Sequence, residues 1–337
     1  MIGGLDYFSM GVFEREYHQI FSRRSFIQTA DCLGSRNSYW SFLDFGHPVT
    51  LRRDGGAFRL LSNVCLHRSS LIDPLGSGDR PFSCGYHGWT YTNTGDLARA
   101  PLVDVGCLKR RKLESETLTD NLGLLFRDRT GTLADDAPLQ ELPLALADGF
   151  FHQSCLEHDA NWKLLVENVL ESYHISAVHG SSFVAMGITS ASELRTGYLP
   201  GGSWFDILGA RRSGLLVGGG DPVPRYRHLY VFPNLFVSLT DNTVGFIGWL
   251  VPVSPAKTIL HWRLFEADGM RRLRASAKET VRRSSIEFTQ KVLEEDRSVL
   301  QLAHIGASRA REPHQLQEAE GRIAHFHGIY SEFMEGA

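Results

Sequence analysis

Two short segments, each with one cysteine and one histidine, constrain this chain more than any other feature of its sequence. The first is Cys65-Leu66-His67 and the second is Cys84-Gly85-Tyr86-His87. Four metal-binding side chains grouped in this way require two loops that approach one another and share a metal centre. Two thiolates and two imidazoles are the ligands either of a tetrahedral zinc ion or of a [2Fe–2S] cluster in which two histidines replace two cysteines.

The distribution of the ligands between the loops decides between these two centres. A zinc finger usually pairs cysteine with cysteine on one loop and histidine with histidine on the other. Here each loop can give one ligand to each iron, so that Cys65 and Cys84 hold one iron and His67 and His87 hold the other. The pattern predicts a Rieske [2Fe–2S] cluster.

Another candidate centre, separate from the cluster, lies about 90 residues further along the chain. The run from Asn161 to Tyr173 lacks glycine and proline, and its apolar residues repeat at helical spacing. His174 and His179 can face one metal if the helix loosens or bends between them. The spacing alone is a weak signal, but a cluster upstream needs an electron acceptor. Two histidines and one carboxylate with open positions form a site that binds Fe(II) and activates O₂, so we predict a mononuclear iron site here.

The periodicity of the apolar residues along the sequence predicts an α+β protein. Short apolar runs broken by turn residues indicate an all-β module over residues 36–135, and 131–148 are expected to connect it to the rest. Residues 1–35 are expected to form an N-terminal helical segment, with a helix over 10–29, that packs on a catalytic domain over 136–337. In that domain, strands over 183–265 and a long helix from Met270 to about Ala303 predict an antiparallel sheet wrapped around a helix, of the helix-grip type, with an apolar pocket over the iron. The aromatic residues of these strands are expected to belong mostly to the core and partly to the pocket: Trp204, Phe205, Tyr226, Tyr230, Phe232, Phe236, Phe246, Trp249 and Trp262.

Composition limits the possible partners and location. The net charge of −3 over 337 residues leaves no basic surface expected to bind nucleic acid, and no apolar run has transmembrane length. Residues 1–30 lack the apolar core of a signal peptide. Five cysteines, an odd number, argue against a disulfide framework, and Cys32, Cys107 and Cys155 are expected to be buried thiols. We expect a cytoplasmic protein with no nucleic-acid or membrane partner.

At both candidate centres the sequence resembles the oxygenase (alpha) subunits of Rieske non-haem iron oxygenases. The resemblance rests on residues 63–68 and 86–91, on Asn-Trp-Lys at 161–163, on Glu-Asn at 167–168, and on an acidic residue three positions before the first histidine. Leu66 is a departure, since the family commonly has proline there, and we expect it to change the stiffness of the loop more than the coordination. The tail over 325–330 resembles the C-terminal helix of the choline and carnitine oxygenase branch.

This resemblance implies further site residues. The third iron ligand is expected to be the aspartate of an acidic pair on the late helix, which matches Asp296, with Glu295 as the alternative. Asn168 is expected to be catalytic. Glu171 is expected to bridge the two centres by accepting hydrogen bonds from His174 and from His87 of a neighbouring subunit.

The function implied is that of the terminal component of an oxygenase system. Its cofactors would be the Rieske cluster and Fe(II), with O₂ as co-substrate. A separate flavin or iron–sulfur reductase is needed, because the sequence contains no nucleotide-binding fingerprint, and the resemblance implies a head-to-tail homotrimer.

The expected substrate is a small N-methylated or quaternary ammonium compound, hydroxylated with demethylation or C–N cleavage. An aromatic ring or a natural-product scaffold is the alternative. Two other classes stay open: an electron-transfer Rieske protein and a zinc-stabilised binding module.

Overall fold

The structure is a computed structural model that describes residues 2, 4–104, 106, 108, 111–131, 149–190, 192, 194–208, 225–310 and 314–336. The chain divides into two compact units. One comprises Phe26–Arg129, and the other combines Met1–Ser25 with Thr130–Ala337. Cys107 and most of the predicted connection over 131–148 lie outside the described residues.

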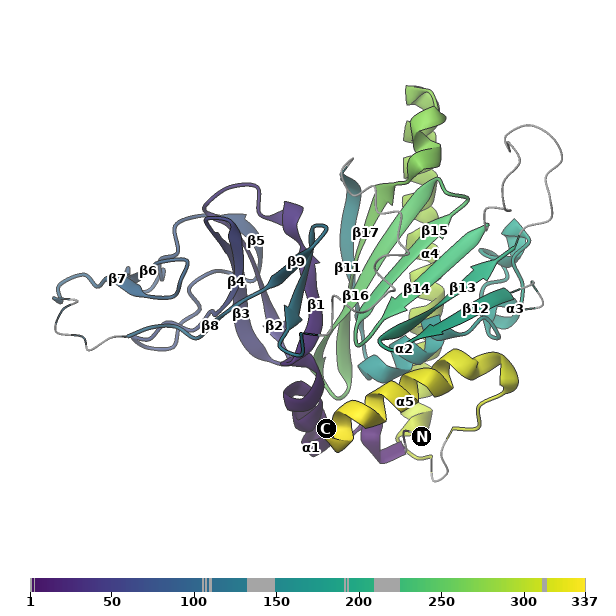
Figure 1. Cartoon of the computed structure of the whole chain (residues 1–337), viewed down its shortest axis with the longest axis horizontal. Helices are drawn as coiled ribbons and strands as arrows, with labels where there is room; N and C mark the ends of the chain where they lie inside the picture. Colours follow the sequence, from purple (N-terminus) through teal and green to yellow (C-terminus); the bar gives the residue numbers. More distant parts are fainter. Residues whose placement is uncertain are drawn as a thin grey trace. The chain divides into compact units, whose positions relative to one another are not determined.

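The unit over residues 26–129 is built from antiparallel strands (Figure 1). A five-stranded sheet has the order β5-β2-β3-β4-β8, a three-stranded sheet the order β1-β10-β9, and β6 pairs with β7. The strands are β1 (Arg24–Thr29), β2 (Ser38–Asp44), β3 (His47–Asp54), β4 (Ala57–Ser62), β5 (Gly76–Asp79), β6 (Thr90–Tyr91), β7 (Leu97–Arg99), β8 (Ser115–Thr117), β9 (Thr119–Asn121) and β10 (Leu124–Asp128).

Buried polar pairs hold the start of the first Cys-His loop of this unit against the sheet. Asp73 is fully buried, and its carboxylate accepts two hydrogen bonds from Arg52 of β3, at 2.7 and 2.9 Å. Asn63, which directly follows β4, donates to the backbone carbonyl of Asp73 and accepts from its amide, both at 2.8 Å. A buried charge is stable only when it is paired and hydrogen-bonded, as here. This network therefore fixes the start of the first loop.

The other unit contains a seven-stranded antiparallel sheet in the order β11-β17-β16-β15-β14-β13-β12. The strands are β11 (Phe150–His158), β12 (Leu194–Leu199), β13 (Gly202–Ile207), β14 (Tyr226–Val231), β15 (Leu235–Thr240), β16 (Val244–Ser254) and β17 (Lys257–Glu266). The longest helix, α4, runs along one face of the sheet (Figure 1). The helices are α1 (Met10–Glu16), α2 (Trp162–Leu170), α3 (Ile175–Val178), α4 (Ala275–Ala307) and α5 (Gly321–Glu335), with short helical turns at Gly4–Tyr7, Tyr17–Phe21, Ala30–Cys32, Val184–Met186, Asp268–Arg272 and Glu318–Glu320.

The helix predicted over 10–29 is wrong in its second half. The α-helix ends at Glu16 and a π-helical turn at Phe21, and Arg24–Thr29 form strand β1. All six residues of β1 are buried, and β1 lies beside β10 in its sheet. Pairing with β10, about 100 residues away in sequence, overrides the local helical spacing.

The N-terminal helix is attached to the catalytic unit through a buried carboxylate. Glu16 accepts hydrogen bonds from Lys163 at 2.5 Å, from the indole of Trp162 at 2.9 Å and from the hydroxyl of Tyr330 at 2.8 Å. Glu16 and Lys163 are both fully buried. One carboxylate therefore joins α1, α2 and α5.

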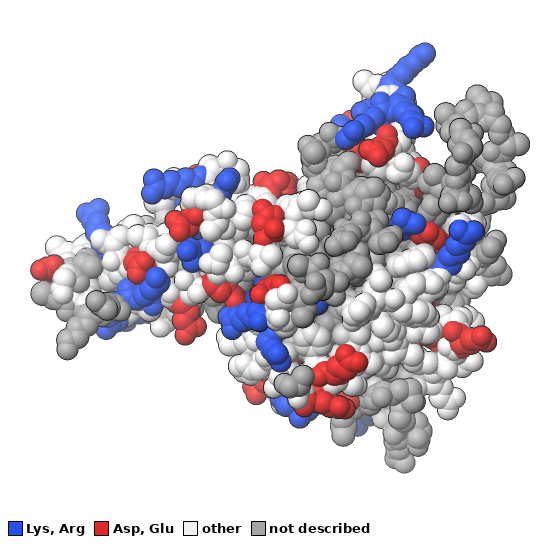
Figure 2. Space-filling view, in the orientation of Figure 1, with Lys and Arg blue, Asp and Glu red and all other residues white. Residues whose placement is uncertain are grey.

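Charged side chains of both signs are interspersed over the face of the molecule shown in Figure 2. Of the residues described, no helix combines the length and apolar character needed to cross a bilayer.

The prediction that the cysteines outside the cluster are buried is wrong for Cys155, which is exposed, and Cys32 is half-buried.

Candidate metal centres

The break in the helix after Leu170 creates the geometry of the first candidate centre. Asn161 caps α2 by accepting a hydrogen bond from the amide of Lys163 at 3.0 Å. At Glu171 the backbone turns to an extended conformation (φ −126, ψ 164), and the Glu171 carboxylate accepts hydrogen bonds from the amides of Tyr173 and His174. The short helix α3 then starts after His174 and ends before His179. The bend that the histidine spacing required is therefore present.

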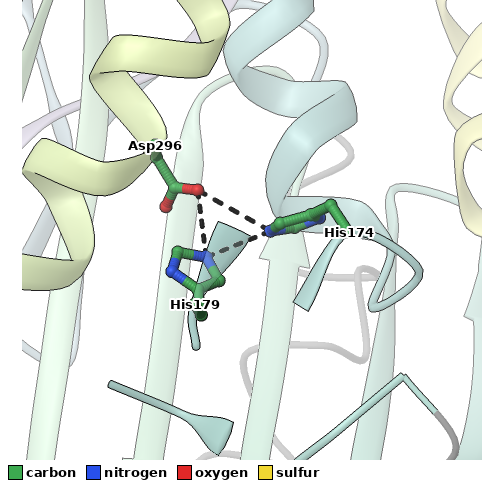
Figure 3. A group of neighbouring side chains, drawn as sticks. All are labelled: His174, His179 and Asp296. Atoms are coloured by element: carbon green, nitrogen blue, oxygen red, sulfur yellow. Dashed lines mark hydrogen bonds and ion pairs between the residues drawn. The ribbon is translucent and has the colours of Figure 1, made fainter. Parts of the chain in front are cut away.

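His174, His179 and Asp296 converge on one point (Figure 3). The two Nε2 atoms are 3.2 Å apart. Oδ1 of Asp296, from helix α4, lies 3.1 Å from Nε2 of His179 and 3.6 Å from Nε2 of His174. This oxygen is buried, and geometric criteria give it no hydrogen-bond partner within the described part of the chain. Two imidazole nitrogens and an unsatisfied carboxylate oxygen are the donor set that suits Fe(II), so these residues fit a mononuclear iron.

Each histidine is oriented by a second carboxylate. Nδ1 of His174 hydrogen-bonds the Glu171 carboxylate, and Nδ1 of His179 lies 2.8 Å from Oε2 of Glu295. Glu295 also accepts hydrogen bonds from Ser182 at 2.6 Å and from Ser181 at 3.0 Å. Burial opposes ionisation of Glu295, but the hydrogen bonds from His179 and the two serines lower its pKa. With Nδ1 of both rings occupied, Nε2 is left to bind metal.

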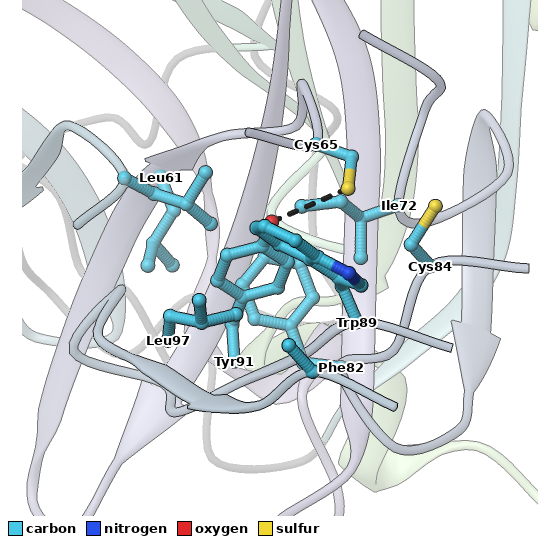
Figure 4. Packing of buried hydrophobic residues seen from close by; sticks show 10 residues of the cluster. Leu61, Cys65, Ile72, Phe82, Cys84, Trp89, Tyr91 and Leu97 are labelled. Carbon is cyan, nitrogen blue, oxygen red and sulfur yellow. Dashed lines mark hydrogen bonds between the residues drawn. The ribbon is translucent and has the colours of Figure 1, made fainter. Parts of the chain in front are cut away.

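The second candidate centre lies on the two loops of the β unit. Cys65 and Cys84 are buried in one hydrophobic cluster, where both sulfur atoms are visible in Figure 4, and both are free thiols. His67 and His87 are exposed, and their ring centroids are 4.5 Å apart. The structure therefore brings the four predicted ligands together, with the thiols inside and the imidazoles at the surface.

The spacing of these four side chains bears on the choice between zinc and a cluster. Within the described ranges, only His174, His179 and Asp296 offer three ligand atoms that all lie within 4.8 Å of one another. The loop ligands do not meet at a single point, as the ligands of one zinc ion must. A [2Fe–2S] cluster does not require such a point, because each of its two irons binds only one pair of the side chains.

Aromatic residues support both loops. The hydroxyl of Tyr91 lies 3.2 Å from Sγ of Cys65 and accepts a hydrogen bond from the amide of Leu66 at 3.0 Å. Because that amide is the donor, the Tyr91 proton is free to point at the sulfur. Burial raises the pKa of the Cys65 thiol, and the Tyr91 hydrogen bond opposes that rise. The ring of His67 stacks on that of Trp89, with a centroid distance of 4.9 Å.

A cavity of about 450 Å³ opens onto the iron-binding residues. It lies between α4 and the sheet, and Asn168 and Glu171 line it beside His174, His179 and Asp296. Of the aromatic residues predicted from the strands, four line the cavity: Phe205, Tyr226, Phe236 and Phe246.

Among the lining residues with ring side chains, sequence reasoning missed four. Phe183 follows His179 in sequence, and Phe288 lies two turns before Asp296 on α4. His158 and His228 come from β11 and β14, and they had no partner spacing in the sequence. The strand alternation that puts His228 on the same face as Tyr226 was the one available signal.

The fold and the two centres define a protein with a [2Fe–2S] domain and a catalytic domain for a mononuclear metal. Residues 30–112 match the family described as Rieske [2Fe-2S] domain, and residues 149–336 match that described as ring hydroxylating alpha subunit (catalytic domain). The chain belongs to the ring-hydroxylating alpha subunits of the Rieske oxygenases. It is an enzyme, the oxygenase component of such a system, and this membership implies a Rieske cluster, a mononuclear iron and O₂ as co-substrate.

The similar proteins include enzymes named for a diamine and for a quaternary ammonium compound. The putrescine 2-hydroxylase of Ralstonia nicotianae is 25% identical over 98% of this chain and 94% of its own length. The carnitine monooxygenase oxygenase subunit of Acinetobacter baumannii is 30% identical in a region that covers 51% of this chain and 51% of that relative. A solved quaternary ammonium Rieske monooxygenase in complex with L-carnitine has the same fold, with a TM-score of 0.78 at 18% identity over 98% of this chain and 95% of its own.

Proposed function

We propose that this oxygenase hydroxylates a small N-methylated or quaternary ammonium compound, with demethylation or C–N cleavage as the outcome. The observation that carries the proposal is the aromatic cavity that opens onto His174, His179 and Asp296. Phenyl and phenol faces attract cations through their quadrupoles, and carnitine monooxygenase is among the similar proteins.

The residues would divide the chemistry between two centres. His174, His179 and Asp296 would hold the mononuclear iron. Cys65 and Cys84 would hold one iron of the cluster, and His67 and His87 would hold the other. When bound, the iron activates O₂ and the cluster supplies electrons singly. Glu171 and Glu295 keep the two iron-binding imidazoles in the tautomer with a free Nε2. Asn168, on the cavity wall, would contact the substrate.

Glu171 is proposed as the bridge between the centres of adjacent subunits. Its carboxylate already contacts Nδ1 of His174. The exposed ring of His87 is available to another molecule, and a hydrogen bond from it to Glu171 would connect cluster and iron across a subunit boundary.

The partners follow from this arrangement. Enzymes of this class take electrons from a separate reductase, which we propose contains flavin or an iron–sulfur centre. A head-to-tail homotrimer is proposed because its closed ring gives every iron one cluster from a neighbour. We also propose a cytoplasmic location, because an odd number of cysteines argues against a disulfide framework.

Hydroxylation of an aromatic ring is the second candidate. Most of the residues that line the cavity are apolar, and an apolar cavity of this size accommodates a small ring.

The test is O₂ consumption coupled to a reductase across quaternary ammonium, N-methylated and neutral aromatic compounds. We expect stimulation by ammonium compounds and an aldehyde product. Stimulation by neutral aromatics alone would select the second candidate. A His174→Ala variant is the control, because it should keep the visible absorption and EPR signal of the cluster but consume no O₂. A colourless protein that contains only zinc would contradict both candidates.

A further inference from the structure

Among the residues that the structure describes, no carboxylate pairs with the guanidinium that lies behind one wall of the cavity. Arg322, on α5, is 4% exposed. Its side chain donates to Oγ of Ser203 at 2.9 Å, to the backbone carbonyls of Ser203 and Leu170 at 3.2 Å each, and to Nδ1 of His228 at 3.2 Å. All four acceptors are neutral. Burial lowers its pKa to about 9, so the group is still a cation at neutral pH.

This contact sets the tautomer of His228. A guanidinium can only donate, so Nδ1 of His228 is the acceptor and the ring proton resides on Nε2. Burial and the charge of Arg322 hold the pKa of His228 well below its usual value, which keeps the ring neutral. In the part of the chain that the structure describes, Nε2 has no hydrogen-bond partner. Because Arg322 is behind the wall and His228 lines the cavity, the unused N–H is the one available to a ligand.

An aromatic wall connects this N–H with the iron-binding residues. The ring of His228 stacks on that of Phe205 with a centroid distance of 5.4 Å, and the ring centroids of Phe205 and Tyr226 are 5.8 Å apart. The ring centroids of Tyr226 and Phe183 are 5.7 Å apart, and those of Phe183 and His179 are 5.3 Å apart. A ligand lying along this wall can place one end at His228 and the other beside the metal.

The acidic groups of the cavity do not neutralise Arg322. Three carboxylates line it, those of Glu171, Asp241 and Asp296. Glu171 contacts His174, and Asp296 is the proposed iron ligand. None of the three makes an ion pair with Arg322 among the described residues. An anion brought near a buried cation gains Coulomb energy that offsets the cost of its own desolvation, and a neutral imidazole between the two can transmit the interaction as a hydrogen bond.

We propose that the cavity takes substrates that carry a carboxylate, which accepts a hydrogen bond from Nε2–H of His228 with Arg322 behind it. The inference rests on the proposed function and narrows it. The substrate is a carboxylated amine, and a simple cation lacking the carboxylate is a poor ligand. His228 is the specificity-determining residue, and Arg322 is a positioning residue that fixes its tautomer.

The test compares ligand pairs that differ only by a carboxylate. The pairs are γ-butyrobetaine with propyltrimethylammonium, ornithine with putrescine, and anthranilate with aniline. Dissociation constants are measured by calorimetry on the protein loaded with both iron centres, without O₂. In any pair that binds, we expect the carboxylated member to bind about tenfold to hundredfold more tightly, since a charge-assisted hydrogen bond discriminates to this extent.

Variants separate recognition from a structural role. His228→Phe should reduce the ratio within a pair to below about threefold, because the donor is lost and the ring volume is kept. His228→Gln, which keeps an N–H donor, should retain part of the preference. His261→Phe is the matched control, since His261 lies on β17 but does not line the cavity. Iron content and melting temperature are measured on every variant, because a merely structural role would change both members of a pair equally.

The outcomes distinguish this inference from the substrate class proposed above. If only anthranilate and aniline bind, and with the expected ratio, the ammonium proposal fails and the carboxylate site stands. Equal affinities within every binding pair, no binding by any carboxylated member, or an unchanged ratio in His228→Phe would overturn the carboxylate site.

Discussion

Oε2 of Glu295 lies 2.8 Å from Nδ1 of His179, while Oδ1 of the next residue, Asp296, lies 3.1 Å from Nε2 of the same ring. Two adjacent carboxylates of α4 thus contact opposite edges of one imidazole. Glu295 can orient the ring, and Asp296 can share a metal with it.

This relationship predicts different consequences for the two acidic residues. Asp296→Ala should abolish binding of the mononuclear iron, because a ligand is lost. Glu295→Ala should weaken Fe(II) binding by roughly 10–100-fold, the usual effect of removing a partner that orients a metal ligand. Iron is titrated into the apo site and measured after desalting, with the cluster absorption as an internal standard. Full iron occupancy in Asp296→Ala would show that another residue supplies the carboxylate.

The hydrogen bond between Tyr91 and Cys65 predicts the redox behaviour of the cluster. A hydrogen bond to a cluster sulfur stabilises the reduced state and raises the potential. Such a bond to a charged group contributes about 1.5 kcal/mol, which is about 60 mV for a one-electron couple. Tyr91→Phe should therefore lower the reduction potential by tens of millivolts without loss of iron. Potentiometry monitored by EPR measures it, and a potential equal to the wild-type value would contradict the assignment. Tyr86→Phe is the control, because Tyr86 is exposed.

The position of Glu171 predicts an effect on electron transfer rather than on metal content. Glu171→Gln should keep both iron centres but largely stop reoxidation of the prereduced cluster in a single turnover with substrate and O₂. Glu171→Asp should lose less, because the charge remains and the side chain is one methylene shorter. Product formation by Glu171→Gln at the wild-type rate would exclude the bridging role.

The buried pair of Glu16 and Lys163 predicts a large effect on stability. Lys163→Met should leave the Glu16 carboxylate buried without its cation, which costs about 3–5 kcal/mol and lowers the melting temperature by roughly 10 °C or more. Lys257→Met is the control, because the side chains of Lys257 and Glu157 pair at 2.7 Å while 39% and 61% exposed, and exposed pairs contribute little. Thermal unfolding followed by circular dichroism compares the two. Similar melting temperatures for both variants would show that the buried pair does not hold α1 and α2 together.

Much of both centres could be predicted from the sequence because their ligands are local. Cys65 with His67, Cys84 with His87, and His174 with His179 are each within five residues, so one loop or one helical bend brings each pair together. The long helix α4 and the strands of the large sheet were also evident, because their apolar periodicity extends over many residues.

Only the tertiary structure decided the features that join distant segments. Successive residues of an α-helix point about 100° apart, so the direction of α4 relative to His179 determines that Asp296 rather than Glu295 meets both imidazoles. Because they pair with β10, residues Arg24–Thr29 form a strand instead of the second half of the predicted helix. The contact between Arg322 and His228 spans 94 positions of the chain. Nothing in the local sequence of either residue encodes it, because it exists only where the last helix packs against the sheet.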